Sequence, residues 1–144
     1  MPNKVNLSVI ADLKEAALSA VKHGHSLEAA VILFQMVEGL LRIAVRVFGR
    51  TRGVSENVLA KVADKEQSFA RLVMHLDLVC PRNGLSARLL ALNTSRNRLM
   101  HSLFGKFQSV DQIRDELNSF GTEAVALNKE IRQLLGVERE DGKT

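Results

Sequence analysis

The 144-residue sequence contains no Trp and no Tyr, and aromatic residues make up only 4% of it. Glycine and proline are also scarce, with 9 and 2 residues respectively. A β-sandwich normally uses more aromatic, β-branched and turn residues than this. With only six phenylalanines, an RNA-binding module that stacks bases on exposed aromatic side chains is not expected either. The composition therefore favours a helical protein.

The sequence has one cysteine, Cys80, which excludes an internal disulfide and a cysteine-based zinc site. His23 and His25 could hold a metal ion, but no third ligand follows at a fixed spacing. A glycine-rich phosphate-binding loop is also missing from the sequence. We therefore expect no metal and no cofactor, and a reducing compartment.

Long hydrophobic runs are missing as well. The longest uncharged apolar-rich stretch covers residues 29–37, and Glu38, Arg42 and Arg46 interrupt the apolar residues beyond it. The first residues, MPNKVNLSV, lack the apolar core of a signal peptide. These features predict a cytoplasmic protein with no membrane-spanning segment.

Charge is unevenly distributed along the sequence, whose formal net charge is +4. Residues 1–108 contain 15 basic and 8 acidic residues, whereas residues 109–144 contain 5 and 8. The positive charge thus lies in the body of the chain, as expected for a protein that binds a polyanion such as RNA. A mildly basic surface without a ligand explains the same balance.

Hydrophobic periodicity divides the sequence into about five helices, and no strand pattern competes with them. The fifth has the strictest pattern, with an apolar residue every three or four positions from Val110 to Leu134. Short loops make successive helices antiparallel, so the sequence predicts an all-α, up-and-down helical bundle. The expected helices cover residues 8–23, 26–48, 55–79 with a break allowed near Asp64, 86–105 and 109–135.

Serines and glycines mark the expected helix ends. The expected N-caps are Ser26, Ser55 and Ser86, and Ser109 opens a capping box with Gln112. Glycines expected to follow helix ends are Gly24, Gly49 and Gly136. Residues 1–136 are therefore expected to form a single domain, followed by a charged tail over 137–144 that frays.

The second expected helix has a row of polar residues within an otherwise apolar sequence. The row consists of Gln35, Glu38, Arg42 and Arg46, and spacings of three and four place it on one helix face. Glu38 and Arg42 are four residues apart in the orientation that favours an ion pair. The row is either a solvated stripe with one local ion pair or a face on which Glu38 points into a polar cleft.

The fourth expected helix places an arginine on its apolar face. Arg96 continues the spacing of Leu92 and Leu99, and a guanidinium in such a position is costly unless it is paired. Asn97 and His101 lie one turn apart and project side by side. The three polar residues offer a fixed cation, an amide and an imidazole, the groups needed to bind a phosphate and move a proton from a ribose 2′-hydroxyl.

The run from Arg96 to His101, Arg-Asn-Arg-Leu-Met-His, resembles the motif of the HEPN superfamily (higher eukaryotes and prokaryotes nucleotide-binding). That motif is Arg, four to six residues and then His, and Asn, Asp or His commonly follows the Arg directly. An acidic residue on an earlier helix, as Glu38 is here, is similar to the family as well. The resemblance covers about residues 26–135 as a helix pattern, but only the six-residue motif is specific.

The resemblance implies a homodimer in which two copies of the motif share a cleft, and a metal-independent endoribonuclease of the toxin or abortive-infection type. His101 would transfer a proton, Arg96 would hold the scissile phosphate, and Asn97 would orient the phosphate or His101. Products would be a 2′,3′-cyclic phosphate and a 5′-hydroxyl. Glu38 and Arg42 would support the site, and a cognate antitoxin or regulatory protein is a possible partner. Basic residues that could line the approach of RNA are Arg46, Arg50, Arg52, Arg98 and Lys106.

The sequence departs from one subset of the family and leaves a second interpretation open. That subset has Tyr two residues after the histidine, where this sequence has Leu103, so silencing by tyrosine modification is excluded. In the second interpretation, Arg96 and His101 make only structural hydrogen bonds to Glu38 and backbone carbonyls. The protein would then be a non-catalytic helical dimer that binds protein or nucleic acid, similar to mannitol operon repressor-like regulators. The apolar seam of the fifth helix would supply its interface.

Overall fold

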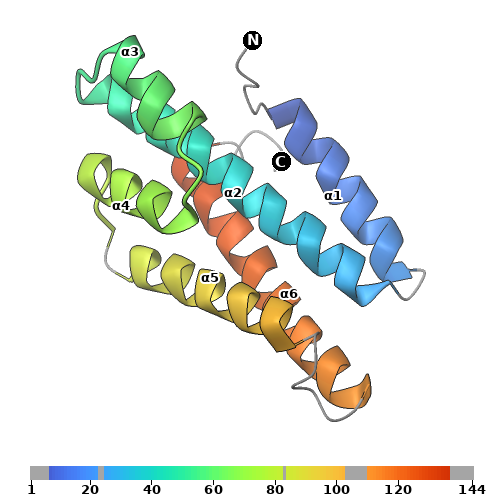
Figure 1. Ribbon diagram of the computed structural model, residues 1–144. Coiled ribbons are helices and arrows are strands. Elements are labelled where there is room, and N and C mark those ends of the chain that lie inside the picture. The colour runs from blue at the N-terminus through green and yellow to red at the C-terminus, as the bar shows by residue number, and fades with distance from the viewer. Residues whose placement is uncertain (1–6, 23–24, 83, 103–109, 137–144) are drawn as a thin grey trace.

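The computed structural model describes residues 7–22, 25–82, 84–102 and 110–136, and all regular structure within these ranges is helical (Figure 1). The predicted all-α bundle is therefore confirmed. None of the described helices combines the length and the apolar character needed to cross a membrane. The elements are α1 (Leu7–Lys22), α2 (Ser26–Thr51), α3 (Glu56–Leu59), the π-helical turn η1 (Ala60–Asp64), α4 (Phe69–Val79), α5 (Leu85–Ser102) and α6 (Val110–Leu135).

Helix α2 is the central element of the fold. It packs against α1, α3, η1, α4 and α6. Helix α5 packs instead against α4 and α6. The helices α2, α4, α5 and α6 therefore form a four-helix arrangement in which α2 and α5 are diagonally opposite, and α1 lies outside it against α2 (Figure 1). This geometry explains why the buried surface of α2 is wider than a single seam. The side chains that α2 buries include Phe34, Met36, Leu40, Leu41 and Val45.

Aromatic side chains fill the centre between the diagonal helices. The rings of Phe34 and Phe69 have centroids 4.7 Å apart, and those of Phe34 and Phe120 are 6.1 Å apart. The three residues come from α2, α4 and α6 and are all buried. Phe34 therefore marks the point where these three helices meet, and α5 faces it from the fourth side.

Helix α4 is much shorter than its neighbours. Its 11 residues span about 16 Å, whereas the 18 residues of α5 span about 27 Å. Helix α5 consequently continues past the N-terminal end of α4, alongside the beginnings of α2 and α6 (Figure 1). At the end of the bundle beyond the start of α4, the centre is enclosed among the described helices by α2, α5 and α6 alone.

The apolar seam predicted on the fifth helix is confirmed over its described part, which lies on α6. Leu117, Phe120, Ala124, Leu127 and Ile131 are all buried within the chain. The bundle itself covers these five side chains, so they are not available for the dimer interface expected on this seam.

Several predicted helix ends shift for physical reasons. Gly49 does not end its helix: α2 continues to Thr51, and the chain turns at Gly53, where φ is +83°. Gly49 instead permits close packing, because a Cβ at that position would lie 2.6 Å from Leu59 Cδ2. Residues 65–68 separate η1 from α4, which confirms the break allowed near Asp64.

The predicted caps have mixed outcomes. Ser55 caps α3, since its Oγ accepts a hydrogen bond from the Val58 N–H. Ser26 and Ser86 are not caps, because α2 and α5 already include them; Ser86 Oγ donates to Asp77 Oδ1 at 3.0 Å instead. Gly136 follows α6 with φ of +80°, as predicted. Gly24, Ser109 and the tail over 137–144 lie outside the described residues.

Candidate functional site

Arg96 of α5 points toward the centre of the bundle. Its guanidinium carbon lies 4.5 Å from the centroid of the Phe34 ring, a cation–π contact between diagonal helices. Its Nη2 donates to Asn97 Oδ1 at 3.1 Å. Its Nε is buried and has no hydrogen-bond partner among the described residues. An aromatic ring and a neighbouring amide therefore hold the arginine in place.

The positive charge of Arg96 is not neutralised by an ion pair with any described residue. Other arginines of the described chain do pair with carboxylates, among them Arg42, Arg46, Arg50, Arg88 and Arg98. Arg96 is half-buried, and its partners in the described chain are a ring and an amide oxygen. A partly desolvated cation without a counter-ion is suited to bind an anion.

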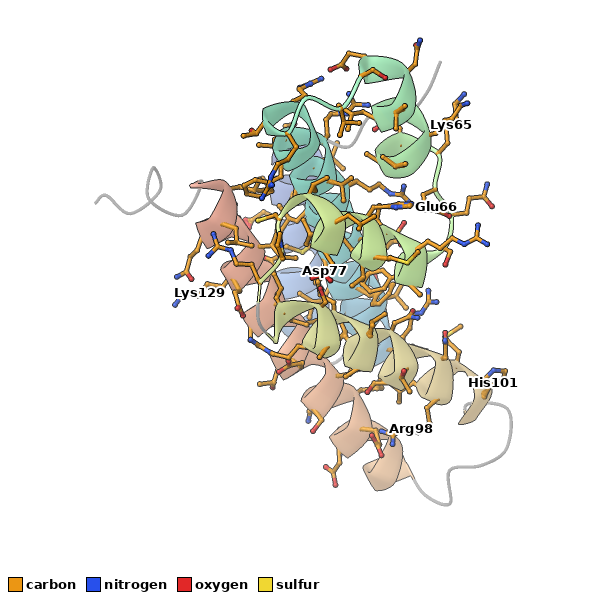
Figure 2. The ribbon with its side chains drawn as sticks, turned by 90° about the vertical axis from the view of Figure 1, so that its left-hand side faces the viewer. Lys65, Glu66, Asp77, Arg98, His101 and Lys129 are labelled. Carbon is orange, nitrogen blue, oxygen red and sulfur yellow. The ribbon has the colours of Figure 1, made fainter. Side chains whose placement is uncertain are left out.

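Asn97 and His101 lie on the exposed side of the same helix. Both side chains are exposed, and His101 projects outward from the last turn of α5 (Figure 2). Asn97 reaches Arg96 through its Oδ1. The structure thus joins two of the three motif residues by a hydrogen bond and places the third one turn further along, open to solvent.

A cavity of about 220 Å³ lies between α2, α5 and α6, and its lining includes no residue of α4. Apolar side chains form most of its lining, and three polar residues join them, namely Gln35 and Glu38 of α2 and Arg96 of α5. Glu38 and Arg96 therefore lie at one cavity although no ion pair joins them among the described residues. Of the two interpretations of the polar row, the cavity favours the one in which Glu38 faces a cleft.

Glu38 is also held from outside the cavity. Its Oε2 accepts a hydrogen bond from Arg42 Nη2 at 2.8 Å, which confirms the predicted pair. Arg42 Nη1 in turn donates to the backbone carbonyl of Ala63 at 2.7 Å. Arg42 thus fixes the carboxylate of Glu38 and ties α2 to η1. These bonds leave Oε1 of Glu38 without a partner among the described residues.

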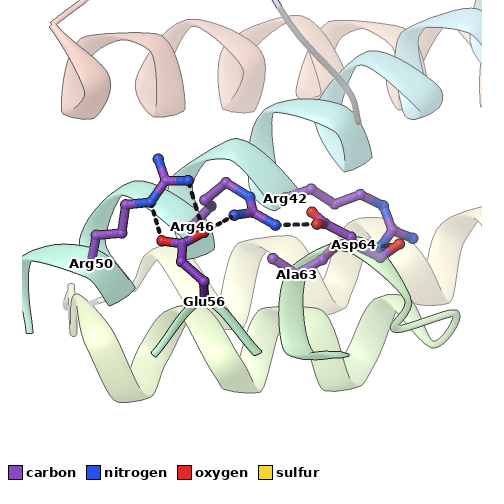
Figure 3. Close-up of polar contacts among 6 residues, drawn as sticks. All are labelled: Arg42, Arg46, Arg50, Glu56, Ala63 and Asp64. Carbon is purple, nitrogen blue, oxygen red and sulfur yellow. Dashed lines mark hydrogen bonds and ion pairs between the residues drawn. The ribbon is translucent and has the colours of Figure 1, made fainter. Parts of the chain in front are cut away.

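The remaining basic residues of α2 hold the α3–η1 segment in place. Arg46 pairs with Glu56 at 3.0 Å and with Asp64, and Arg50 Nε donates to Glu56 at 2.7 Å (Figure 3). The bond from Arg50 lowers the pKa of Glu56, and the bond to Glu56 raises the pKa of Arg50. Both arginines are therefore engaged in structural ion pairs.

The other predicted RNA-contacting residues have different surroundings. Arg98 pairs with Glu116 of α6 at 2.8 Å. Arg52 follows α2 as its C-cap and is exposed. Lys106 and Leu103 lie outside the described residues. Of the predicted RNA-contacting residues, Arg46, Arg50 and Arg98 thus have acidic partners within the described chain.

Two residues of this site are not indicated by the sequence analysis. Helical spacing places Phe34 on the apolar face, and nothing in that spacing indicates a contact with an arginine of another helix. Asn93 lies one turn before Asn97, and its Oδ1 is buried without a hydrogen-bond partner among the described residues. Its position four residues before Asn97, on the row that leads to His101, is the signal that could have identified it.

Comparisons with family models, curated proteins and solved structures found no match to this chain. Within the described residues, no group of three or more His, Cys, Asp or Glu side chains is arranged to hold a metal ion. The class that the fold and site define is an all-helical bundle in which a half-buried arginine, with no carboxylate partner among the described residues, lies beside a three-helix cavity.

Proposed function

We propose that the protein is an HEPN-like endoribonuclease that acts as a homodimer, with Arg96, Asn97 and His101 in its active site. The observation that carries the proposal is that Arg96 has no counter-ion among the described residues. Its guanidinium is half-buried, fixed over Phe34 and without a carboxylate partner in the described chain, which is the arrangement that a phosphodiester anion requires. The accessible imidazole of His101 lies on the same helix.

The proposed reaction is cleavage by the ribose 2′-hydroxyl. A base removes the 2′-proton, the 2′-oxygen bonds to phosphorus, and the 5′-oxygen leaves with a proton from an acid. The products are a 2′,3′-cyclic phosphate and a 5′-hydroxyl, so atoms and protons balance without a co-reactant. His101 performs one of these proton transfers, and Arg96 neutralises the charge that develops on the phosphoryl oxygens.

The experiment compares wild type with His101→Ala on total RNA in the presence of EDTA. His25→Ala is the matched control, because His25 is also exposed but lies at the start of α2, where it pairs with Glu28. We expect wild type and His25→Ala to leave cyclic phosphate ends and His101→Ala to cleave at least about 100-fold more slowly. Cleavage by His101→Ala at the wild-type rate would refute the proposal.

A non-catalytic helical dimer is the second candidate, and one observation favours it. Three large apolar side chains at the cavity are exposed, namely Leu27, Val31 and Met100, and a partner protein would cover them. On this hypothesis the protein is a regulator, and neither wild type nor His101→Ala cleaves RNA. The nuclease hypothesis predicts a cytoplasmic toxin that a cognate antitoxin controls. The hypothesis of a non-catalytic dimer predicts a regulatory protein as the partner.

A further inference from the structure

We propose that the cavity between α2, α5 and α6 binds a guanine base, and that Glu38 selects it. The proposal rests on the proposed function and deepens it, because the base would belong to an RNA nucleotide next to the phosphate held by Arg96. Glu38 takes no part in the proposed proton transfers, so selection of the base gives it a role distinct from those of Arg96 and His101.

The size of the cavity fits one ring system. Its volume is about 220 Å³, below the range of about 300–1,000 Å³ typical of sites for drug-sized ligands. It is several times larger than the volume of one water molecule, which is about 30 Å³. A single splayed-out base matches this size better than a larger cofactor does.

The walls suit a flat apolar ring that enters from solvent. Phe34, Leu99 and Phe120 are buried and form the inner part of the lining. Val31 and Met100 are 44% and 48% exposed, so they stand where the cavity meets solvent. Single-stranded RNA is commonly recognised through unstacked bases that enter such pockets.

The polar groups distinguish guanine from the other bases. Glu38 is 34% exposed. Among the described residues its Oε1 has no partner and its Oε2 accepts only from Arg42, so both oxygens keep lone pairs for further hydrogen bonds. A carboxylate only accepts, and guanine alone presents two adjacent donors, N1–H and the N2 amino group, on its pairing edge. Adenine, cytosine and uracil each place an acceptor beside their single donor group, and that acceptor would face the carboxylate.

Arg96 complements the opposite corner of the same base. Guanine presents O6 and N7 as acceptors, and arginine is their commonest protein partner. The Nη1 of Arg96 makes no hydrogen bond to the described residues, so it is available as a donor. Because Arg96 belongs to both the cavity and the motif, a base bound here adjoins the phosphate that the motif engages.

The first experiment titrates the full-length protein with the four nucleoside 5′-monophosphates by calorimetry. We expect GMP to bind at least about tenfold more tightly than AMP, CMP or UMP, since only guanine can pair two adjacent donors with the carboxylate. Glu38→Gln should abolish this preference. Glu123→Gln is the matched control, because Glu123 is a helical glutamate of similar exposure that also pairs with an arginine, Arg88, away from the cavity.

A second pair of variants tests the cavity without touching the Glu38–Arg42 ion pair. Val31→Trp should block the entrance and weaken GMP binding at least about tenfold. Val125→Trp places the same side chain at an exposed position of α6 outside this cavity, and it should bind GMP like wild type. Equal binding of all four nucleotides, or a guanine preference that survives Glu38→Gln, would overturn the proposal.

A third measurement separates RNA from free nucleotide and keeps this inference distinct from the nuclease. A tetranucleotide with one internal guanine, titrated into His101→Ala so that it is not cleaved, should bind that variant more tightly than GMP does. It has phosphodiesters on both sides of the guanosine that can reach Arg96 and its neighbours, whereas GMP has a single phosphate on its 5′-oxygen. Tighter binding of GMP than of the tetranucleotide would contradict the claim that the bound guanine belongs to RNA. RNA cleavage without any guanine preference would overturn the pocket alone, and guanine binding without cleavage would overturn the nuclease alone.

Discussion

The guanidinium of Arg96 lies over the ring of Phe34, with 4.5 Å between its central carbon and the ring centroid. The two residues belong to helices that make no direct backbone contact within the described chain, so this pair bridges the diagonal of the bundle. It also places a charged group where the core would otherwise be apolar. Several consequences of this placement, and of the surrounding ion pairs, are open to measurement.

Replacement of Arg96 by methionine should affect stability and function in opposite directions. Arg96→Met keeps a flexible apolar side chain over Phe34 but removes the buried Nε, whose missing hydrogen bond costs about 1–3 kcal/mol. We expect an unchanged or higher melting temperature, together with a loss of RNA cleavage of at least about 100-fold. Thermal unfolding and the EDTA cleavage assay measure the two effects.

The control for this variant is Arg71→Met, which removes an exposed arginine of α4 that is not among the predicted RNA-contacting residues. Both its melting temperature and its cleavage rate should stay close to those of wild type. A clear loss of stability in Arg96→Met would instead indicate that Arg96 is a structural residue.

The two acidic partners of Arg46 should differ sharply in their contribution to stability. The side chains of Arg46 and Asp64 are 14% and 8% exposed, whereas Glu56 is 62% exposed. Asp64→Ala leaves the buried guanidinium poorly compensated, which costs about 3 kcal/mol in the free energy of unfolding. Glu56→Ala should cost much less, because solvent screens its pair. Equal losses in urea denaturation would contradict this account.

Stability should depend on acid pH through Glu66. The backbone N–H of Ser68 and then the ring of His75 hold the pKa of Glu66 below its ordinary value of 4.5. A carboxylate with a lowered pKa stabilises the folded state above its unfolded pKa, and this contribution is lost as the pH falls through the folded pKa. Glu66→Gln should therefore melt below wild type at about pH 6, and the difference should shrink toward about pH 3. A difference that stays constant over this range would rule out the linkage.

A methyl group at Gly49 should be harmful for a steric reason. The added Cβ would lie 2.6 Å from Cδ2 of Leu59, a fully buried side chain with little room to move. Overpacking costs about 1–3 kcal/mol and alanine regains about 1 kcal/mol of helix propensity, so Gly49→Ala should be destabilising by about 1 kcal/mol. In a Leu59→Ala background the same change should become neutral or favourable, which a double-mutant cycle in urea would detect.

Local periodicity is enough to predict most of the fold. The seam from Leu117 to Ile131 repeats every three or four residues, and a helix with that spacing has one apolar face whatever its partner is. The prediction that Gly49 ends its helix is wrong, because a glycine near a helix end looks the same in sequence whether it ends the helix or admits a neighbour. The close approach of Leu59 requires the glycine here, and Leu59 belongs to a separate helix, α3.

The candidate site is only partly predictable for the same reason. The spacing of Leu92, Arg96 and Leu99 correctly indicates an arginine on the apolar face of its helix. The second interpretation, in which Arg96 bonds to Glu38, is not met for that bond, since the described partners of Arg96 are Phe34 and Asn97. Contacts between diagonal helices depend on how the bundle assembles, and no local pattern encodes them.

The shortness of α4 has a consequence for motion as well as for shape. The first half of α5 lies against α4, but the half that contains Arg96 and His101 extends beyond the end of α4. Free energies of local opening vary within a protein and are lowest where neighbouring elements are fewest. The backbone amides of residues 96–102 should accordingly exchange with deuterium faster than those of residues 88–92. We therefore expect the end of the bundle that carries the motif to open more readily than the opposite end.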